Sequence, residues 1–357
     1  MKVLITAPSL DPVQNVSGVS SIVNFIVNNN KTAEYVHFEL GKRDNGKGGL
    51  HRLPQLCMAY KKWNETLREY PEALIHYNFP LSTLSILRDF FFMRKVYKKG
   101  RKMVVHIHGG NYLTAPKTPL ILRHFLQKVF SWDLPIIVLS NNEKRLLEEK
   151  YSPKQIEVLP NCVDLKEALK YNKSQKDDEE PLIIGYLGRI EPNKGMNELL
   201  KACERLKNDG VNFKLRIAGK EAHEDEFLPL FDSYLGSCFH YDGIVSGERK
   251  NEFLRSLDVF VLPSYFEGLP ISLLESMSFG AVPVVTPVGS IPEVIENGKN
   301  GYFVEVRDVD SIVNVIQRIY QQRELAFSVG EKAKETIYKQ FSPSEYVNKL
   351  NNIYNTL

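Results

Sequence analysis

Two acidic residues, Glu267 and Glu275, occur with seven residues between them in the stretch YFEGLPISLLESMSFGAVPVV, residues 265–285. Most of their neighbours are apolar residues, Gly or Pro, which is unusual for a solvated charged surface. The pattern predicts a helix with Pro270 in its first turn and Gly280 as the residue that ends it. Glu267 would then lie in the loop before the helix, and Glu275 about one and a half turns into it.

The loop between the two glutamates has the chemistry of an anion site. Backbone N–H groups at the start of a helix lack partners within the helix, and the positive end of the helix dipole lies there. Carboxylates on either side of such a site suit a ligand that carries both phosphates and hydroxyl groups. A sugar nucleotide fits this description, with Glu275 on a ribose diol and Glu267 on a sugar hydroxyl. Ordinary surface charge is the alternative.

Cationic side chains that could neutralise a diphosphate occur in YLGRIEPNKGMNELL, residues 186–200. The pattern predicts a strand that ends at Gly188, a loop with Arg189 and Lys194, and a helix opened by Gly195. Arg presents a planar fork to phosphate oxygens and Lys a point charge, so the two could neutralise a leaving diphosphate without a metal. A solvated loop is the alternative, and the residue order is not that of a Walker loop.

Two weaker signals lie in the first half of the chain. His108 precedes two glycines in HIHGGNY, residues 106–112, where a strand is predicted to end. A histidine in a strand is often a packed core residue, but ligands of α/β domains bind at the carboxyl ends of parallel strands. Gly18 in VSGVSSIVNFI, residues 16–26, is predicted to lie in the first loop, where backbone must approach a ligand closely.

Short β-branched runs alternate with helical patterns along the chain, which predicts parallel sheets with crossover helices. We expect an α/β protein with two doubly wound Rossmann-like domains that face a cleft. The first domain is predicted over 1–168 and the second over 182–339, with a polar linker over 169–181. A C-terminal helix, about 340–357, can pack back on the first domain. The clearest strand patterns are KVLITA, YVHFEL, ALIHYNF, KMVVHIHGG, PIIVLS, LIIGYLGR, FKLRIAGK, VFVLPS and VPVVTP.

Composition limits the class of protein. The chain has 357 residues, of which 43% are hydrophobic and 25% charged, as expected for a globular protein of two domains. No apolar run approaches the roughly 18 residues that span a bilayer, and the N-terminus is typical of a strand, not a signal peptide. The 4 cysteines lack metal-ligand spacing, which favours reduced thiols in the cytoplasm.

Charge is distributed unevenly along the chain. Residues 1–170 carry 25 Lys and Arg against 15 Asp and Glu, whereas the remainder carries 21 against 28. A basic first half suggests that it faces an anionic membrane, a phosphate-bearing substrate or nucleic acid.

Together these motifs resemble glycosyltransferase family 4, the retaining transferases of the GT-B fold, over nearly the whole chain. The most specific part is EGLPISLLE followed by SMSFGAVPVVTPVGSIPEVIENGKNGYFV. The resemblance implies that Glu267 contacts the transferred sugar and Glu275 the ribose. It assigns the diphosphate to Arg189 and Lys194, and a sugar contact to His108. The other donor-binding residues that it implies are Gly18, Ile244 and Val245 at the base, Gly268, Leu269 and Pro270.

The chain departs from the family pattern at positions without charge. The family often has a second glycine before the one at position 18, Gly after Asn161, Phe-Gly after the first glutamate and its glycine, and a second glycine after position 289. None of these changes removes a charged site residue, but together they leave the donor sugar open. The residues that stand at these positions are Ser17, Cys162, Leu269, Pro270 and Ser290.

The resemblance implies a retaining transfer of a hexose or N-acetylhexosamine from a nucleotide sugar, with UDP favoured, to a saccharide acceptor in capsule or exopolysaccharide biosynthesis. Negative charge would build on the leaving phosphate, where Arg189, Lys194 and the helix N-terminus would stabilise it. A departing phosphate oxygen can take the acceptor's proton, so no separate base is required. A nucleophilic role for Glu267 is the less favoured alternative.

No cofactor and no metal are expected. Asp308-Val-Asp310 has the D-x-D form that metal-dependent glycosyltransferases of the other large fold use. Here it precedes SIVNVIQRIY, an apolar-periodic segment, so capping of that helix is the better interpretation.

The acceptor is expected to bind the first domain. The stretch LRDFFFMRKVYKKGRK, residues 87–102, predicts either a helix that lies on an anionic membrane or an ordinary crossover helix with its Phe side chains inward. In the membrane case, the acceptor is a polyprenyl-diphosphate-linked saccharide and the protein is peripheral on the cytoplasmic face of the inner membrane. The basic loop 39–53 could hold acceptor phosphates.

Other classes of function stay open. A nucleotide-sugar epimerase has the same two-domain architecture and needs no acceptor. A nucleic-acid-binding protein would explain the basic half, although no nucleic-acid motif occurs and the acidic half would repel the backbone. A dinucleotide oxidoreductase is a weaker alternative, because no G-x-G-x-x-G follows a predicted strand.

Overall fold

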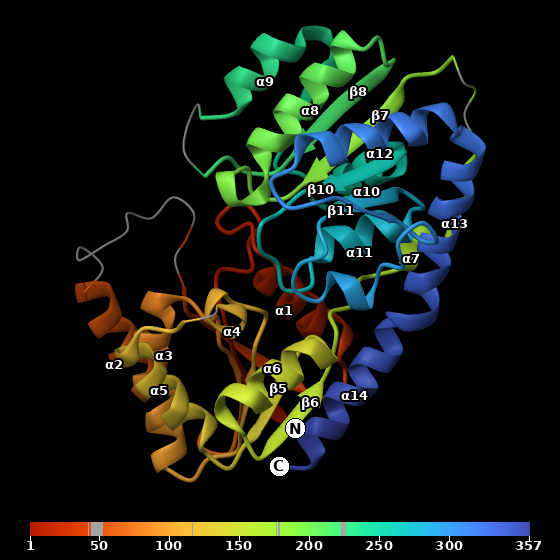
Figure 1. Ribbon diagram of the computed structural model, residues 1–357. Coiled ribbons are helices and arrows are strands. Elements are labelled where there is room, and N and C mark those ends of the chain that lie inside the picture. The colour runs from red at the N-terminus through yellow and green to blue at the C-terminus, as the bar shows by residue number, and fades with distance from the viewer. Residues whose placement is uncertain (42, 44–52, 116, 176, 178, 223–225) are drawn as a thin grey trace. The chain divides into compact units, whose positions relative to one another are not determined.

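A computed structural model describes residues 1–41, 43, 53–115, 117–175, 177, 179–222 and 226–357. It divides the chain into two compact units, and each contains a parallel sheet flanked by helices (Figure 1). Unit 1 consists of Met1–Asn161 with Ser344–Leu357, and unit 2 of Cys162–Pro343.

Unit 1 is built on a six-stranded parallel sheet in the order β2-β1-β3-β4-β5-β6. Its strands are β1 (Lys2–Ala7), β2 (Glu34–Glu39), β3 (Leu74–Asn78), β4 (Met103–His106), β5 (Pro135–Val138) and β6 (Gln155–Val158). Its helices are α1 (Gly18–Asn29), α2 (Leu53–Glu69), α3 (Thr83–Lys98), α4 (Asn111–Thr114), α5 (Leu120–Phe130), α6 (Asn141–Tyr151) and α14 (Pro343–Asn355).

The main core of unit 1 centres on Trp63 of α2, which is fully buried. Its ring lies 4.8 Å from that of Phe38, and its Nε1 donates a hydrogen bond to the carbonyl oxygen of Phe92 at 3.2 Å. That bond satisfies the only polar atom of a large buried side chain, as burial requires. The other tryptophan of the chain, Trp132, packs in the same core.

Unit 2 is built on a second six-stranded parallel sheet, in the order β12-β11-β10-β7-β8-β9. Its strands are β7 (Leu182–Leu187), β8 (Phe213–Ala218), β9 (Phe239–Gly243), β10 (Val259–Leu262), β11 (Val282–Val285) and β12 (Tyr302–Phe303). Its helices are α7 (Lys166–Leu169), α8 (Met196–Asn208), α9 (Leu228–Leu235), α10 (Gly247–Ser256), α11 (Ile271–Ser278), α12 (Val309–Gln321) and α13 (Arg323–Gln340). Short 3₁₀ turns cover Pro192–Lys194, Gly236–Cys238 and Ile291–Glu293.

Both sheets are doubly wound, so each has a point where the strand order reverses. The reversal lies between β1 and β3 in unit 1 and between β7 and β10 in unit 2. Unit 2 has the strand order of Rossmann dinucleotide-binding domains, and unit 1 a flavodoxin-like order with one more strand. Side chains that follow these strands therefore lie where α/β domains bind their ligands.

The predicted α/β architecture with two doubly wound, Rossmann-like units is confirmed. Each of the strand patterns named above forms a strand that begins within one residue of the start of the pattern, and β6, β9 and β12 are additional strands. The basic loop 39–53 falls largely outside the described residues, since 42 and 44–52 are not among them.

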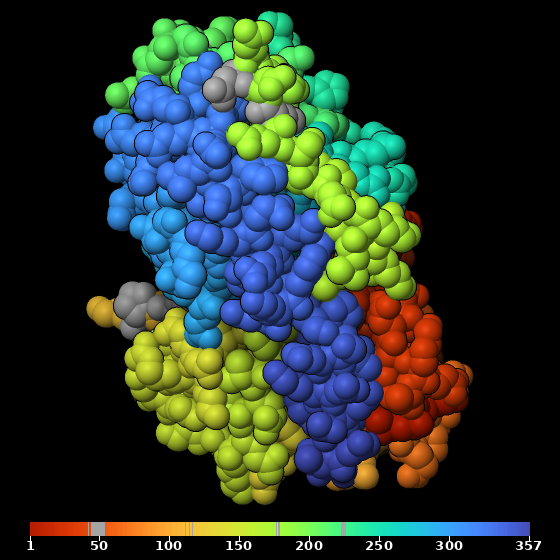
Figure 2. Space-filling model, turned by 90° about the vertical axis from the view of Figure 1, so that its right-hand side faces the viewer, coloured from red at the N-terminus to blue at the C-terminus, as the bar shows by residue number. Residues whose placement is uncertain are grey.

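The boundary between the units differs from the predicted one. Unit 2 begins at Cys162, before the expected linker 169–181. Tyr171 Oη donates to the carbonyl oxygen of Arg255 at 3.0 Å, and Lys334 Nζ donates to that of Tyr171 at 2.7 Å. These contacts fix to unit 2 a segment whose polarity alone predicted a free linker. Figure 2 shows it in yellow-green beside the blue helix α13.

In the part of the chain that the structure describes, no helix combines the length and the apolar character needed to cross a bilayer.

Gly330 in α13 gives a direct test of packing in unit 2. A Cβ at this position would lie 2.4 Å from the carbonyl oxygen of Gly280, where no atom fits. Alanine in a helix is favoured over glycine by about 1 kcal/mol, but overpacking typically costs about 1–3 kcal/mol. Gly330→Ala should therefore lower the thermal unfolding midpoint measured by circular dichroism.

Ser328→Ala is the matched control, because Ser328 lies on the exposed side of the same helix. It should leave the midpoint unchanged or raise it slightly. If Gly330→Ala also raises the midpoint, the close packing of α13 on the end of α11 is contradicted.

Candidate functional site

Charged residues meet at the strand-order reversal of unit 2. Lys194 follows β7, Glu267 follows β10, and Lys194 Nζ lies 2.8 Å from Glu267 Oε1. Only 21% of the Lys194 side chain and 10% of the Glu267 side chain are exposed. Ser264 Oγ donates to the same carboxylate oxygen at 2.7 Å. In this site a phosphate could replace Glu267 as the partner of Lys194, and a hydroxyl group could replace Lys194 as the partner of Glu267.

Close backbone contact brings the loops after β7 and β10 together. Gly195 has a φ of 74°, and a Cβ there would lie 2.2 Å from the carbonyl oxygen of Pro263, so only glycine fits. The amide of Tyr265 donates to the carbonyl oxygen of Asn193 at 2.9 Å. This contact and this glycine place Lys194 within reach of the loop that carries Glu267.

The helix that follows this loop agrees with the sequence except at its first residue. α11 begins at Ile271, and Pro270 is its N-cap instead of part of the first turn, because its ψ of 124° is extended. Gly280 has a φ of 79°, as predicted for the residue that ends the helix. Glu267 lies in the preceding loop and Glu275 in the second turn, which confirms their expected local placement.

A second glycine supports the loop between Glu267 and α11. Gly289 has a φ of 60°, and a Cβ there would lie 2.2 Å from the carbonyl oxygen of Glu267. The amide of Ser290 donates to the carbonyl oxygen of Gly268 at 2.9 Å. The next residue, Leu269, is buried. The residues that follow β11 therefore hold the backbone of this loop in place.

Glu275 also has a cationic partner, Lys250 of α10, at a distance of 2.6 Å. The carboxylate raises the pKa of Lys250 above its usual value, through its charge and through the hydrogen bond that it accepts. Both side chains are partly buried, with 30% of Lys250 and 18% of Glu275 exposed. The pairing links α10 to the helix that begins at the candidate anion site.

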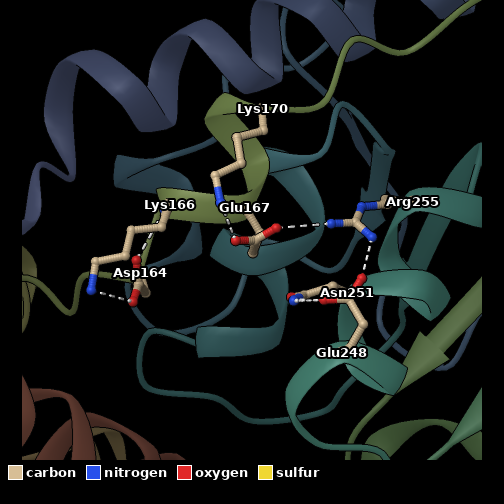
Figure 3. Close-up of polar contacts among 7 residues, drawn as sticks. All are labelled: Asp164, Lys166, Glu167, Lys170, Glu248, Asn251 and Arg255. Atoms are coloured by element: carbon tan, nitrogen blue, oxygen red, sulfur yellow. Dashed lines mark hydrogen bonds and ion pairs between the residues drawn. The ribbon is translucent and has the colours of Figure 1, made fainter.

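Ion pairs on the other side of α10 hold it to α7 (Figure 3). Arg255 donates to Glu167 of α7 at 3.2 Å and also to Glu248 at the start of its own helix. Asn251 donates to the same Glu248 at 3.1 Å. These contacts anchor the helix whose Lys250 binds Glu275.

The structure places the other predicted residues of unit 2 around these pairs. Arg189 is half-buried in the loop after β7, where its carbonyl oxygen accepts a hydrogen bond from the buried Tyr186 hydroxyl. Ile244 and Val245 are half-buried in the loop between β9 and α10. They follow a strand on the same sheet as β7, but no hydrogen bond or ion pair joins them to Glu267 or Glu275 among the described contacts.

The D-x-D sequence caps a helix, as predicted. Asp308 is the N-cap of α12, and its Oδ1 accepts hydrogen bonds from the amides of Asp310 at 2.8 Å and Ser311 at 3.2 Å. Asp310 forms an ion pair with Arg205 of α8. Both aspartates therefore have structural partners within unit 2.

In unit 1, Gly18 was predicted to lie in the loop before α1, but it is the first residue of that helix. Ser17 is the N-cap, and its Oγ accepts from the amide of Ser20 at 3.2 Å. A Cβ on Gly18 would meet nothing within 4 Å. Its backbone does not require glycine, and Ser17 has the cap in place of the second glycine of the family pattern.

His108 follows β4, as predicted, and its Nε2 lies 2.5 Å from Oδ1 of Asn78 at the end of β3. Its ring stacks on that of His106, with centroids 4.0 Å apart. Burial lowers the pKa of His108 and of His76 to about 3, and that of His106 well below its usual value. All three imidazoles are neutral at physiological pH, so His108 can exchange hydrogen bonds but carries no charge.

Comparison with known proteins shows which family unit 2 is similar to. A family model described as "Glycosyl transferases group 1" matches residues 167–336. The match covers just under half of the chain, and it contains the Lys194–Glu267 and Lys250–Glu275 pairs. The predicted resemblance to glycosyltransferases is confirmed, and family 4 is consistent with it.

The similar proteins that we compare are glycosyltransferases. One is the putative colanic acid biosynthesis glycosyltransferase WcaL of Salmonella typhimurium, 29% identical over 52% of this chain and 48% of the relative, so the match spans about half the length of that relative. Another is the Escherichia coli UDP-Gal:alpha-D-GlcNAc-diphosphoundecaprenol alpha-1,3-galactosyltransferase, 24% identical over 71% of this chain and 69% of the relative.

The structure of Anabaena Alr3699/HepE in complex with UDP-glucose superposes with a TM-score of 0.78 at 16% identity, over 100% of both chains. At this identity the likeness shows the fold, which is the predicted GT-B fold. The epimerase alternative has no support in these findings.

Several side chains at the two reversal points were not predicted from the sequence. Lys250 pairs with Glu275 across two helices, and such a pairing leaves no local signal in the sequence. Ser264 is the last residue of the predicted strand VFVLPS, which gives no sign of a contact with Glu267. Asn78 had a usable signal, since it is polar and ends an otherwise apolar strand beside the reversal point of unit 1.

The neutral histidines predict how the stability of unit 1 depends on pH. Below about pH 6.5 the unfolded chain binds protons on these residues while the folded unit does not, so the free energy of unfolding falls as the pH drops from 6.5 toward 3. At pH 5 the loss is on the order of 2 kcal/mol for each buried histidine. Urea unfolding followed by tryptophan fluorescence reports this unit, because both tryptophans lie in it.

Between pH 6.5 and 5, the variant His76→Gln should take up about one proton fewer on unfolding, so the free energy of unfolding should depend less steeply on pH. His240→Gln is the control, because the His240 side chain is 68% exposed and lies in unit 2. A pH slope that His76→Gln leaves unchanged would contradict the neutral, buried state of these imidazoles.

Proposed function

We propose that this protein is a retaining glycosyltransferase that moves a hexose or N-acetylhexosamine from a UDP-sugar to a saccharide acceptor, without a metal. The observation that supports this best is the Lys194–Glu267 ion pair at the strand-order reversal of a group 1 glycosyltransferase domain. The pair provides a cation for a diphosphate and a carboxylate for a sugar hydroxyl at the place where Rossmann-like domains bind nucleotides.

Binding of the donor would exchange partners within this pair. The diphosphate replaces the Glu267 carboxylate as the partner of Lys194, and a sugar hydroxyl replaces the lysine as the donor to Glu267. Arg189 on the same loop and the amides at the start of α11 add positive potential around the phosphates. Glu275, in the second turn of α11, accepts hydrogen bonds from the ribose hydroxyls.

The chemical step breaks the bond between the sugar C1 and the β-phosphate oxygen and forms a bond between C1 and the acceptor oxygen. The acceptor's proton passes to the leaving phosphate on the same face of the sugar, so the anomeric configuration is retained. Negative charge that develops on the phosphate is stabilised by Lys194 and Arg189, which are positioned before the reaction begins.

The experiment is an assay of nucleoside diphosphate release from UDP-glucose, UDP-galactose, UDP-N-acetylglucosamine, UDP-N-acetylgalactosamine and GDP-mannose, in EDTA, with lipid-diphosphate-linked saccharides as acceptors. We expect acceptor-dependent release from one UDP-sugar and, by NMR of the product, retention. Lys194→Gln should lower kcat by about 100- to 1000-fold, the usual effect of removing one donor to a developing anion. Lys201→Gln, which changes an exposed lysine on the next helix, is the control.

Three results would contradict parts of the proposal. Release of nucleotide from none of the donors would remove the transferase activity itself. Loss of activity in EDTA with recovery in Mg²⁺ would show that a metal is required. An inverted product would exclude the same-face mechanism.

We also propose that the acceptor is membrane-linked and that helices α3 and α5 contact an anionic bilayer. Of the phenylalanines in α3, Phe90 and Phe92 point into the core, whereas 51% of Phe91 is exposed. The Phe91 ring lies 6.2 Å from that of Phe125 in α5, so the two helices share one surface. Exposed apolar and basic residues of this surface, the α3–α5 face, are Leu84, Phe91, Leu120, Ile121, Arg94, Lys98, Arg123 and Lys128.

Apolar side chains among basic ones fit the interface of a bilayer with anionic lipid. The double variant Phe91→Ser/Ile121→Ser should reduce co-flotation with vesicles that contain phosphatidylglycerol. Leu230→Ser/Leu325→Ser is the control, because it removes exposed leucines from unit 2. Equal flotation of both variants would contradict membrane binding by the α3–α5 face. If the wild-type protein does not co-float with any of the vesicles, membrane contact is excluded.

A further inference from the structure

A line of buried polar side chains crosses unit 1 and ends beside His108. Tyr354 of α14 has its hydroxyl 2.6 Å from Nδ1 of His76 in β3. His76 Nε2 lies 3.1 Å from Nδ1 of His106 in β4. The ring of His106 then stacks on that of His108. The side chains of Tyr354, His76 and His106 are almost completely buried, so every proton in the line must have a defined place.

The far end of the line is held by an amide side chain. The Thr32 amide donates to Asn30 Oδ1 at 3.2 Å, which fixes the orientation of the Asn30 side chain. Asn30 Nδ2 therefore donates to Tyr35 Oη at 2.8 Å, and the Tyr35 hydroxyl hydrogen-bonds in turn to Tyr354. The Tyr354 hydroxyl thus bridges Tyr35 and His76.

A hydrogen bond also joins the two buried rings. His76 and His106 are neutral and each carries one ring proton, so the Tyr354–His76 and His76–His106 hydrogen bonds require the same tautomer in both rings. Nε2 of His106 has no hydrogen-bond partner among the described residues, and it belongs to the ring that lies against His108.

Asn78 decides the tautomer of His108 independently. Asn78 Nδ2 donates to the carbonyl oxygen of Thr6 at 2.6 Å, and a carbonyl can only accept. Asn78 Oδ1 therefore faces His108, and His108 Nε2 must carry the proton of their 2.5 Å hydrogen bond. Nδ1 of His108 is left as an acceptor, buried and without a donor among the described residues.

We propose that Asn78 is a positioning residue that holds His108 as the Nε2–H tautomer, so that its Nδ1 accepts a hydrogen bond from a hydroxyl group of a saccharide bound to unit 1, and that Tyr354 and His76 fix the ring of His106 against which His108 stacks. This rests on the proposed function only for the identity of the hydroxyl. An apolar core would fill the same volume without the desolvation cost of these groups, so a specific role accounts for their presence better than packing does.

The test is the two-bond ¹H–¹⁵N NMR spectrum of the histidine rings in the full chain, in which protonated and bare ring nitrogens have distinct ¹⁵N shifts. Signals are assigned with His76→Gln, His106→Gln and His108→Gln. At neutral pH we expect the Nε2–H pattern for His108 and one common pattern for His76 and His106. Asn78→Leu should convert His108 to a mixture of tautomers, and Tyr354→Phe should do so for His76 and His106.

Asn64→Leu is the matched control, because Asn64 donates to the carbonyl oxygen of Tyr60 at 2.8 Å and does not belong to the line. A wild-type His108 that is the Nδ1–H tautomer or a mixture would overturn the proposal, even if Asn78→Leu does not fold. So would an Asn78→Leu variant that folds and keeps the wild-type pattern.

Activity separates this inference from the proposed function. Asn78→Leu should lower kcat/KM about tenfold or more, the usual effect of losing one oriented hydrogen bond, whereas Asn64→Leu should not. If His108→Gln is fully active, the sugar contact proposed here for His108 is wrong. The NMR pattern would still decide whether Asn78 sets the tautomer.

Discussion

The ion pair between Lys194 and Glu267 is the contact on which the donor side of unit 2 depends. Both side chains are mostly buried, so each compensates for part of the desolvation cost of the other's charge. Removing one partner of such a pair typically costs about 3–5 kcal/mol, whereas a ligand that offers a replacement for each partner avoids that cost. The pair is thus stable without a ligand and able to exchange partners when a diphosphate and a hydroxyl group arrive together.

The geometry of the backbone makes this pair possible. Gly195 lets the loop after β7 approach the end of β10, and Gly289 lets the loop after β11 approach Glu267. A side chain at either position would separate loops whose charged groups must lie within hydrogen-bond distance. Lys250 and Glu275 repeat the arrangement one helix away, with α10 held in place by Arg255.

The two units solve a similar problem with different chemistry. Unit 2 gathers formal charges at its strand-order reversal, as phosphates require. Unit 1 gathers neutral groups, with Asn78, Thr6 and a stack of uncharged histidines. Neutral donors and acceptors with fixed directions suit sugar hydroxyls, which carry no charge and are distinguished by geometry.

The sequence predicted most of the fold because buried parallel strands are short apolar runs between helices, as in KVLITA and VPVVTP. It did not predict β9, whose middle residues His240 and Tyr241 are exposed, or β12, which has two residues. The sequence did not predict that the segment around Tyr171 belongs to unit 2, because the contact of Tyr171 with Lys334 joins segments far apart in the chain.

For the site, the motif residues Lys194, Glu267 and Glu275 were identified from local spacing and from the family resemblance. Their partners Ser264 and Lys250 were not, since each is recognisable only once separate loops or helices are brought together. Tyr354 lies 278 residues from His76, so the line that ends at His108 has no local signature at all.

The measurement that tests the central claim most directly is the affinity of UDP relative to uridine, by isothermal titration calorimetry, for the wild type and Lys194→Gln. Uridine lacks the phosphates, so the ratio isolates what the cation contributes to their binding. We expect the preference for UDP to fall by about tenfold or more in the variant while uridine binds both proteins equally, as for the loss of one charge-assisted hydrogen bond. A preference for UDP that the substitution leaves unchanged would contradict a phosphate site at Lys194.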